Sequence, residues 1–158
     1  MKKIIICGPG GSGKDYLAKK FKDKGYKFAV THTTRPPRSG EVHGVDCNFI
    51  TQDEFQLLID SEQFIEYIQF NGWYYGTTID TFNGSDVFIM NPSGINKLKP
   101  MIRDSSLIIY LDIPQEVLID RLSKRNMTVD TLEKRLEADR QEFFNFSIYD
   151  IRITNPNF

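Results

Sequence analysis

The sequence has little of the material that disulfide frameworks and metal clusters require. Two of its 158 residues are cysteine and two are histidine. Cys7 and Cys47 are too few and too far apart for a disulfide framework, and we expect Cys7 to be a small core residue. His32 and His43 have no partner at metal-ligand spacing, which argues against a zinc site.

An excess of one charge and long apolar runs are also missing. The formal net charge is −1, so no basic excess is available to drive general binding to nucleic acid or to a membrane surface. The first apolar run, at residues 4–6, is far too short for a signal peptide or a membrane span, and we expect a cytoplasmic protein. The length and the hydrophobic content of 40% predict a single domain over residues 1–158. We also expect a monomer or weak homodimer, although no sequence feature decides between them.

Apolar runs and helix signals alternate along the chain. We predict strands at residues 3–7, 28–31, 47–51, 64–70, 73–75, 87–90, 107–111 and 148–154, and helices at about 16–21, 51–60, 114–125 and 130–144. Asn71-Gly72 is a strong hairpin signal, and Thr51 with Glu54 matches a capping box. The pattern predicts a parallel α/β core at both ends of the chain, with a hairpin-bearing insertion between them.

Residues 8–15, Gly-Pro-Gly-Gly-Ser-Gly-Lys-Asp, lie between the first strand and the first helix. Glycines let consecutive backbone N–H groups turn toward an anion, the helix N-terminus adds positive potential, and Lys14 adds a full charge. The segment therefore predicts a phosphate-binding loop, and a turn that merely packs would leave Lys14 unexplained. Asp15 stands where the pattern has Ser or Thr. It could coordinate Mg²⁺, or it could be a helix N-terminal acid that interacts with the helix dipole.

A stiff basic segment and an isolated acid supply two further candidates. The prolines at 36 and 37 favour an extended backbone that places Arg35 and Arg38 on one side, where both can grip a phosphate monoester. The alternative is a solvated basic loop. Glu66 lies among apolar residues of one strand face, together with residues 64, 68 and 70. It suits the N1–H and amino group of guanine, or else a salt bridge to an arginine.

Together these segments resemble guanylate kinase, the P-loop enzyme that transfers the γ-phosphoryl group of ATP to GMP. The similarity spans nearly the whole chain. Its strings are G-P-x-G-x-G-K at 8–14, T-T-R-x-P-R-x-G-E-V-x-G-x-D at 33–46, F-I-E-Y at 64–67, N-G-W-Y-Y-G-T at 71–77, R-L-x-x-R at 121–125, R-L at 135–136 and Y-D-x-x-I-x-N at 149–155. The string R-x-P-R-x-G-E-V-x-G is specific to that family rather than to P-loops at large.

The resemblance implies an α/β fold with a P-loop NTPase-type three-layer α/β/α core and a parallel sheet, formed by residues 1–31 and 81–158. It also implies a β-rich monophosphate-binding insertion at 32–80 and a helical lid at about 121–135. ATP and GMP or dGMP would be the small-molecule partners, with Mg²⁺ as cofactor and with no nucleic acid or membrane partner. ATP would be bound by Gly8, Gly10, Gly11, Ser12, Gly13, Lys14, Asp15 and Arg121; GMP by Thr31, Arg35, Arg38, Glu66, Tyr75, Thr77 and Asn91; and Lys14, Arg38, Arg125 and Arg135 would be catalytic.

Several positions depart from the family pattern. Asp15 replaces the usual hydroxyl residue, Cys47 stands where the family has a tyrosine that donates to the acceptor phosphate, and Asn91 stands about where it has an aspartate. The chain stops at Phe158 without the family's usual closing helix. In this respect the sequence resembles a compact, C-terminally shortened variant of the family. An acid lost near Asn91 and gained at Asp15 gives the hypothesis that one carboxylate has moved across the metal site.

The predicted function is phosphoryl transfer from ATP to GMP or dGMP. One alternative is a kinase of broader deoxynucleotide specificity, since Cys47 and Asn91 could relax the acceptor pocket. Another is a non-catalytic guanylate-kinase-like module that binds protein ligands with the old acceptor site. Such modules usually lose the loop lysine, so the retention of Lys14, Arg35 and Arg38 favours the enzyme.

Overall fold

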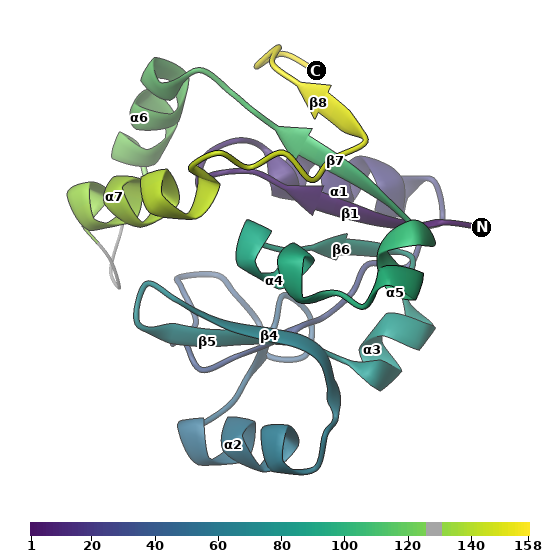
Figure 1. The fold of residues 1–158 in the computed structure, drawn as a ribbon. Coiled ribbons are helices and arrows are strands. Elements are labelled where there is room, and N and C mark those ends of the chain that lie inside the picture. The colour runs from purple at the N-terminus through teal and green to yellow at the C-terminus, as the bar shows by residue number, and fades with distance from the viewer. Residues whose placement is uncertain (126–130) are drawn as a thin grey trace.

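The computed structural model describes residues 1–125 and 131–158, and their strands form two four-stranded sheets (Figure 1). The first sheet is wholly parallel, in the order β6–β1–β7–β8. Its strands are β1 at Lys3–Cys7, β6 at Val87–Ile89, β7 at Ser106–Leu111 and β8 at Ile151–Ile153. Ile5, Ile6, Phe88 and Ile108 have no exposed surface, which confirms that the apolar runs of β1, β6 and β7 are buried on both faces, whereas the edge strand β8 is largely exposed.

Helices cover both faces of this sheet, because alternate residues of each strand point to opposite sides. On one face, Ile5 and Ile108 belong to a cluster with side chains of three helices, α4 (Pro92–Lys97), α5 (Pro100–Asp104) and α7 (Leu132–Phe143). On the other face, Ile6 and Ile109 pack against α1 (Lys14–Asp23) and α6 (Gln115–Ser123). The result is the three-layer α/β/α core that the sequence predicts.

The second sheet is built entirely from residues 32–78 and has the order β3–β2–β5–β4. Its strands are β3 at Asn48–Phe49, β2 at His32–Thr33, β5 at Trp73–Thr78 and β4 at Phe64–Phe70. The β4–β5 hairpin turns at Asn71 and Gly72, both with positive φ, as the Asn-Gly signal predicts. The capping box predicted at Thr51 and Glu54 is also present and opens α2 (Gln52–Asp60), and α3 (Ile79–Gly84) leads the chain back to the first sheet.

A register shift in β4 changes one predicted strand face. The alternation predicts Phe64 on the same face as Glu66, but a shift between these two residues interrupts the pairing of β4 with β5. Phe64 stacks instead on Phe55 of α2, with ring centroids 4.6 Å apart. Glu66, Ile68 and Phe70 remain buried. The extra residue frees Phe64 to join an aromatic cluster on the α2 side of the sheet.

The strand predicted at residues 28–31 does not form. Its first part hydrogen-bonds to the first sheet, where the amide of Ala29 donates to the carbonyl of Val87 at 2.8 Å. Its last residue already joins the second sheet, where the carbonyl of Thr31 accepts from the amide of Asn48 at 2.8 Å. A segment that changes sheets within three residues cannot continue either ladder. The short helices α3, α4 and α5 were not predicted.

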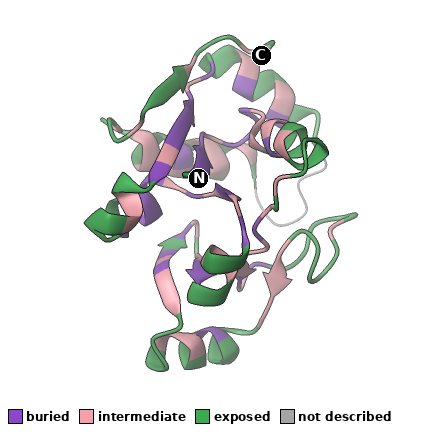
Figure 2. Ribbon diagram, turned by 90° about the vertical axis from the view of Figure 1, so that its right-hand side faces the viewer, coloured by how far each residue is buried: buried purple, intermediate pink, exposed green. Residues whose placement is uncertain are grey.

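Burial is concentrated in the first sheet and thins toward the far side of the second (Figure 2). Helix α2 buries Phe55 and leaves most of its other residues exposed. No helix within residues 1–125 and 131–158 is long and apolar enough to cross a membrane.

Candidate functional site

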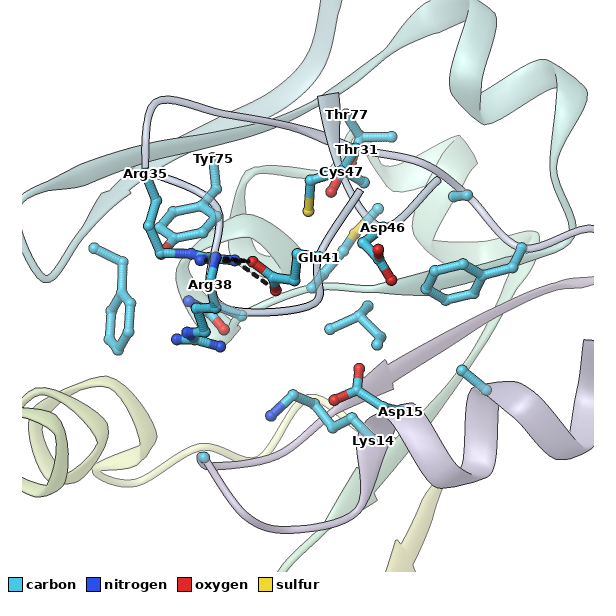
Figure 3. Close-up of a pocket in the computed structure, with 18 of the residues that line it drawn as sticks. Lys14, Asp15, Thr31, Arg35, Arg38, Glu41, Asp46, Cys47, Tyr75 and Thr77 are labelled. Carbon is cyan, nitrogen blue, oxygen red and sulfur yellow. Dashed lines mark hydrogen bonds and ion pairs between the residues drawn. The ribbon is translucent and has the colours of Figure 1, made fainter. Parts of the chain in front are cut away.

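A cavity of about 740 Å³ lies where the glycine loop and the ends of the first sheet face the second sheet (Figure 3). It brings together all but three of the predicted site residues. Those that line it are Gly10, Gly11, Gly13, Lys14, Asp15, Thr31, Arg35, Arg38, Glu66, Tyr75, Thr77, Asn91, Arg125 and Arg135. Residues more than 100 positions apart in the sequence therefore share one site.

The other three predicted residues support the glycine loop from outside the cavity. Gly8 and Ser12 face each other beneath the loop, where a Cβ on Gly8 would lie 2.5 Å from the Ser12 Oγ. The guanidinium of Arg121 donates to the carbonyl of Gly11 at 3.0 Å and to that of Pro156 at 2.9 Å. Arg121 thus holds the loop against the C-terminal segment.

The glycine loop has the backbone that an anion cradle requires. Gly11 and Gly13 have φ of 80° and 96°, in the left-handed region that favours glycine, and α1 begins directly afterwards at Lys14. The N–H groups of the first helical turn have no acceptor within the helix, so they are available to donate to an anion bound at the loop. Such a turn binds phosphate with backbone N–H groups rather than with side chains.

Lys14 lies across this loop, and its ammonium donates to the carbonyls of Gly8 at 2.6 Å and Pro9 at 2.9 Å. Burial lowers the pKa of Lys14 to about 8, and the positive charge of Arg135 acts in the same direction. Nearby carboxylates, Asp15 first, partly oppose this. Because burial disfavours the charged form of Lys14, an anion bound beside it would stabilise that form.

Asp15 is exposed in the first turn of α1 and faces the cavity beside Lys14, with the carboxylate of Asp46 on the opposite wall (Figure 3). The described residues hold no group of three or more acids, histidines or cysteines placed to bind a metal by themselves. One or two carboxylates that complete their coordination with substrate phosphates are, however, the usual way in which proteins hold Mg²⁺. The donor set at Asp15 fits that pattern.

Arg35 and Arg38 both line the cavity, as the extended segment predicts. The guanidinium of Arg35, however, is already paired with the carboxylate of Glu41. Its Nη1 and Nη2 donate to the two oxygens of Glu41 at 3.0 and 3.1 Å, and the amide of Arg38 donates to Glu41 at 2.6 Å (Figure 3). Burial pushes the pKa of Glu41 up, but these hydrogen bonds bring it below its usual value. Glu41 therefore stays ionised and holds the guanidinium of Arg35 and the backbone of Arg38.

The positive groups repel one another across the cavity. Burial, followed by the charges of Arg35 and Arg135, lowers the pKa of Arg38. The Arg135 guanidinium lies 5.3 Å from the ring centroid of Phe70, on the acceptor side. Tyr75, half-buried in β5, adds a hydroxyl to the same cluster. This arrangement suits an anion that binds between the arginines.

Glu66 also lines the cavity, beside Thr77, and is 7% exposed. Burial raises its pKa to about 7, while hydrogen bonding to Thr77 acts in the opposite direction. A Cβ on Gly94 would lie 2.7 Å from its Oε2, so glycine at 94 makes room for the carboxylate. The ion pairs found in the described ranges include none between Glu66 and an arginine, so the salt bridge that was the alternative prediction is not seen there.

Sequence reasoning left several cavity residues without a role. Glu41 stands inside the R-x-P-R-x-G-E string and could have been noticed there. Ile68 and Phe70 form an apolar wall that the strand alternation already placed beside Glu66. Asp139, which contacts the glycine loop, gave no sequence signal. The predicted lid at about 121–135 includes residues 126–130, which lie outside the described residues.

Known proteins similar to this chain share its sequence and its fold. A guanylate kinase of Campylobacter jejuni (strain RM1221) is 36% identical over 164 residues, which cover 96% of this chain and 80% of that protein. A crystal structure of guanylate kinase from Anaplasma phagocytophilum matches with a TM-score of 0.71 at 22% identity, over 98% of this chain and 76% of that one. A sugar kinase from Janibacter sp. HTCC2649 matches with a TM-score of 0.50 at 17% identity, over 99% and 88% of the two chains.

At these identities the two structural likenesses show the fold alone. The sequence comparisons go further, because a family model for guanylate kinase matches residues 1–158 and the bacterial relative is similar over nearly the whole chain. The chain therefore belongs to the guanylate kinase family.

Proposed function

We propose that this protein transfers the γ-phosphoryl group of ATP to GMP or dGMP, giving ADP and GDP or dGDP. One observation carries the proposal: a single cavity is lined at one end by a glycine loop with its lysine and at the other by a buried carboxylate and two arginines. Two nucleotides bound at these ends would meet at their phosphates. Family membership supports the same reaction.

In the acceptor half, Glu66 would accept hydrogen bonds from guanine N1–H and the exocyclic amino group. A carboxylate offers two oxygens at the spacing of these donors. Thr31, Thr77 and Asn91 line the cavity around it and would complete the pocket. Arg35, Arg38 and Tyr75 would bind the acceptor phosphate, with Glu41 holding the arginines in position.

In the donor half, Lys14 and the loop amides after Gly10 would hold the ATP phosphates, while the amide of Gly10 stays bonded to Asp139. Lys14 would exchange its present loop carbonyls for phosphate oxygens, and the negative charge would raise its pKa again. Arg125 and Arg135 line the cavity between the two halves and would contact the group in transfer. We propose that residues 32–80 act as the acceptor insertion and about 121–135 as a lid that closes during turnover.

Transfer would be direct, with no covalent enzyme intermediate. The cavity offers positioning and positive charge, which are what a loose phosphoryl-transfer transition state requires. Asp15, with Asp46 opposite, is the acid that would hold Mg²⁺, and the bound ion would supply positive charge beside the donor phosphates. Lys14 and the arginines of the cavity would supply further positive charge.

A coupled ADP-release assay with ATP·Mg²⁺ and a panel of NMPs and dNMPs tests this function. We expect turnover with GMP and dGMP and little with the other acceptors, because Glu66 matches guanine alone among the bases. Turnover with many deoxynucleotides would contradict the guanine assignment. Absence of turnover with every acceptor would contradict the enzyme and favour a binding module.

A further inference from the structure

Helix α7 reaches the site through three side chains spaced at helical intervals. Arg135 lines the main cavity, Asp139 contacts the glycine loop, and Glu142 contacts the first turn of α4. Positions four and three residues apart lie on one side of a helix. Glu142 accepts from the amide and hydroxyl of Ser93 at 2.7 and 2.8 Å, which fixes the C-terminal half of α7 to the start of α4.

Asp139 makes the corresponding contact to the loop after β1. Its Oδ2 accepts from the amide of Gly10 at 2.8 Å, across 129 residues of sequence, and the side chain is buried. A buried charge is kept only where hydrogen bonds and opposite charges stabilise it. The opposite charge is the guanidinium of Arg135, whose Nε lies 3.5 Å from the same Oδ2.

Glycine at position 10 is part of this contact. A Cβ there would lie 3.0 Å from the Nε of Arg135 and 3.1 Å from the Oδ2 of Asp139. A Cβ at position 10 would therefore press on the Arg135–Asp139 pair, which would have to shift by a few tenths of an ångström to make room. The loop and the pair therefore form one packed unit.

We propose that Asp139 is a positioning residue that sets Arg135 against the glycine loop, so that the guanidinium is aligned with the donor phosphates. The carboxylate engages the Gly10 amide and the Nε edge of Arg135 together. It thereby fixes the distance between the loop that holds the donor and the arginine that contacts the transferring group. The proposal rests on the proposed function, because turnover is its main readout.

A second role for the carboxylate, as an internal anion that competes with the donor phosphates, fits the geometry less well. Asp139 lines a separate cavity of about 440 Å³ together with Pro9, Leu118 and Arg140, whereas Arg135 lines the main cavity. The carboxylate therefore approaches the loop from behind. Phosphates that enter through the main cavity need not displace it.

Two substitutions at Asp139 test the proposal. Asp139→Ala removes both contacts, and we expect kcat to fall roughly 10- to 100-fold, as small misalignments of catalytic groups do. We expect the KM for GMP to change less than about twofold, since the acceptor contacts are untouched. Asp139→Asn keeps an acceptor for Gly10 but loses the charge that attracts Arg135, so its kcat should fall between those of Asp139→Ala and the wild type.

A double-mutant cycle with Arg135→Ala separates positioning from general stability. If Asp139 acts through Arg135, Asp139→Ala should change kcat less than about twofold in the Arg135→Ala background. An unchanged kcat in Asp139→Ala, or full additivity in the cycle, would overturn the proposal. If Asp139→Ala does not fold, Asp139→Asn takes its place in the same cycle.

ADP titration followed by calorimetry completes the test and needs no turnover. We expect Asp139→Ala to bind ADP as tightly as the wild type or more weakly. Tighter binding would show a competing anion and would overturn positioning. Glu137→Gln, on the exposed side of α7, is the matched control and should leave both readouts unchanged. A wild-type chain that binds ADP but phosphorylates no acceptor would instead contradict the proposed function.

Discussion

In the acceptor half, the burial of Glu66 lowers the stability of the folded protein when its carboxylate is ionised. Glu66 is a buried carboxylate whose pKa of about 7 lies well above the ordinary value of 4.5, mainly because of burial. It must be ionised to accept two hydrogen bonds from guanine. Burial therefore disfavours the ionised form of Glu66, which is the form that its proposed function uses.

The sign of this effect gives a prediction for Glu66→Gln. The folded chain holds the Glu66 proton more tightly than the unfolded chain, so stability falls as the pH rises from about 4.5 to about 7. The two pKa values differ by an amount that corresponds to about 3 kcal/mol. Because glutamine stays neutral, Glu66→Gln should raise the free energy of unfolding by up to about 3 kcal/mol at pH 8 and by much less at pH 5.

Urea unfolding at the two pH values measures this difference. Glu137→Gln, which removes an exposed carboxylate, should change the free energy of unfolding little at either pH. The kcat/KM of Glu66→Gln for GMP should fall at the same time. A Glu66→Gln chain that is no more stable than the wild type at pH 8 would contradict the buried-carboxylate account.

At the scale of elements, the N-terminus of α1 combines a phosphate-binding backbone with an unusual acid. Asp15 faces the cavity beside Lys14 (Figure 3). If its carboxylate holds the metal, Asp15→Ser should raise the Mg²⁺ concentration that gives half-maximal turnover, because a hydroxyl is the weaker ligand. Initial rates across a Mg²⁺ titration measure it, and unchanged Mg²⁺ dependence and turnover would leave Asp15 as a helix N-terminal acid.

The second sheet depends on aromatic packing around one glycine. A Cβ on Gly76 of β5 would lie 2.6 Å from Cε1 of Phe64 and 3.1 Å from Cζ of Phe55. Gly76→Ala should therefore force the two stacked rings apart and destabilise the protein by about 1–3 kcal/mol. Gly84→Ala is the matched control, since a Cβ there meets nothing within 4 Å. Equal urea midpoints for the two variants would contradict this packing role.

Local sequence patterns predicted the elements whose causes are local. The glycine loop, the Asn71-Gly72 turn and the capping box at Thr51 each depend on neighbours within a few residues, and all three form. The strand predicted at 28–31 was wrong because the hydrogen bonds of that segment belong to two sheets. The predicted face of Phe64 was wrong because its packing on Phe55 comes with a register shift in β4.

At the scale of the whole molecule, the site is a product of long-range contacts. The bidentate pairing of Arg35 with Glu41 could be suspected from a motif, but the contact of Asp139 with Gly10 joins residues at opposite ends of the chain. Sequence patterns predicted which residues bind nucleotide or take part in the transfer. They could not show that Arg121 turns to the C-terminal segment while Arg135 enters the cavity.

The proposed function requires that the donor and acceptor nucleotides meet in one cavity and that Lys14 takes part in the transfer. The most direct measurement follows the label of γ-labelled ATP after mixing with Mg²⁺, GMP and the protein. We predict labelled GDP in equal amount to ADP, no label on the protein, and a rate that falls roughly 10²- to 10³-fold in Lys14→Ala. Label in free phosphate or on the protein in place of GDP, or a Lys14→Ala rate near that of the wild type, would contradict the account.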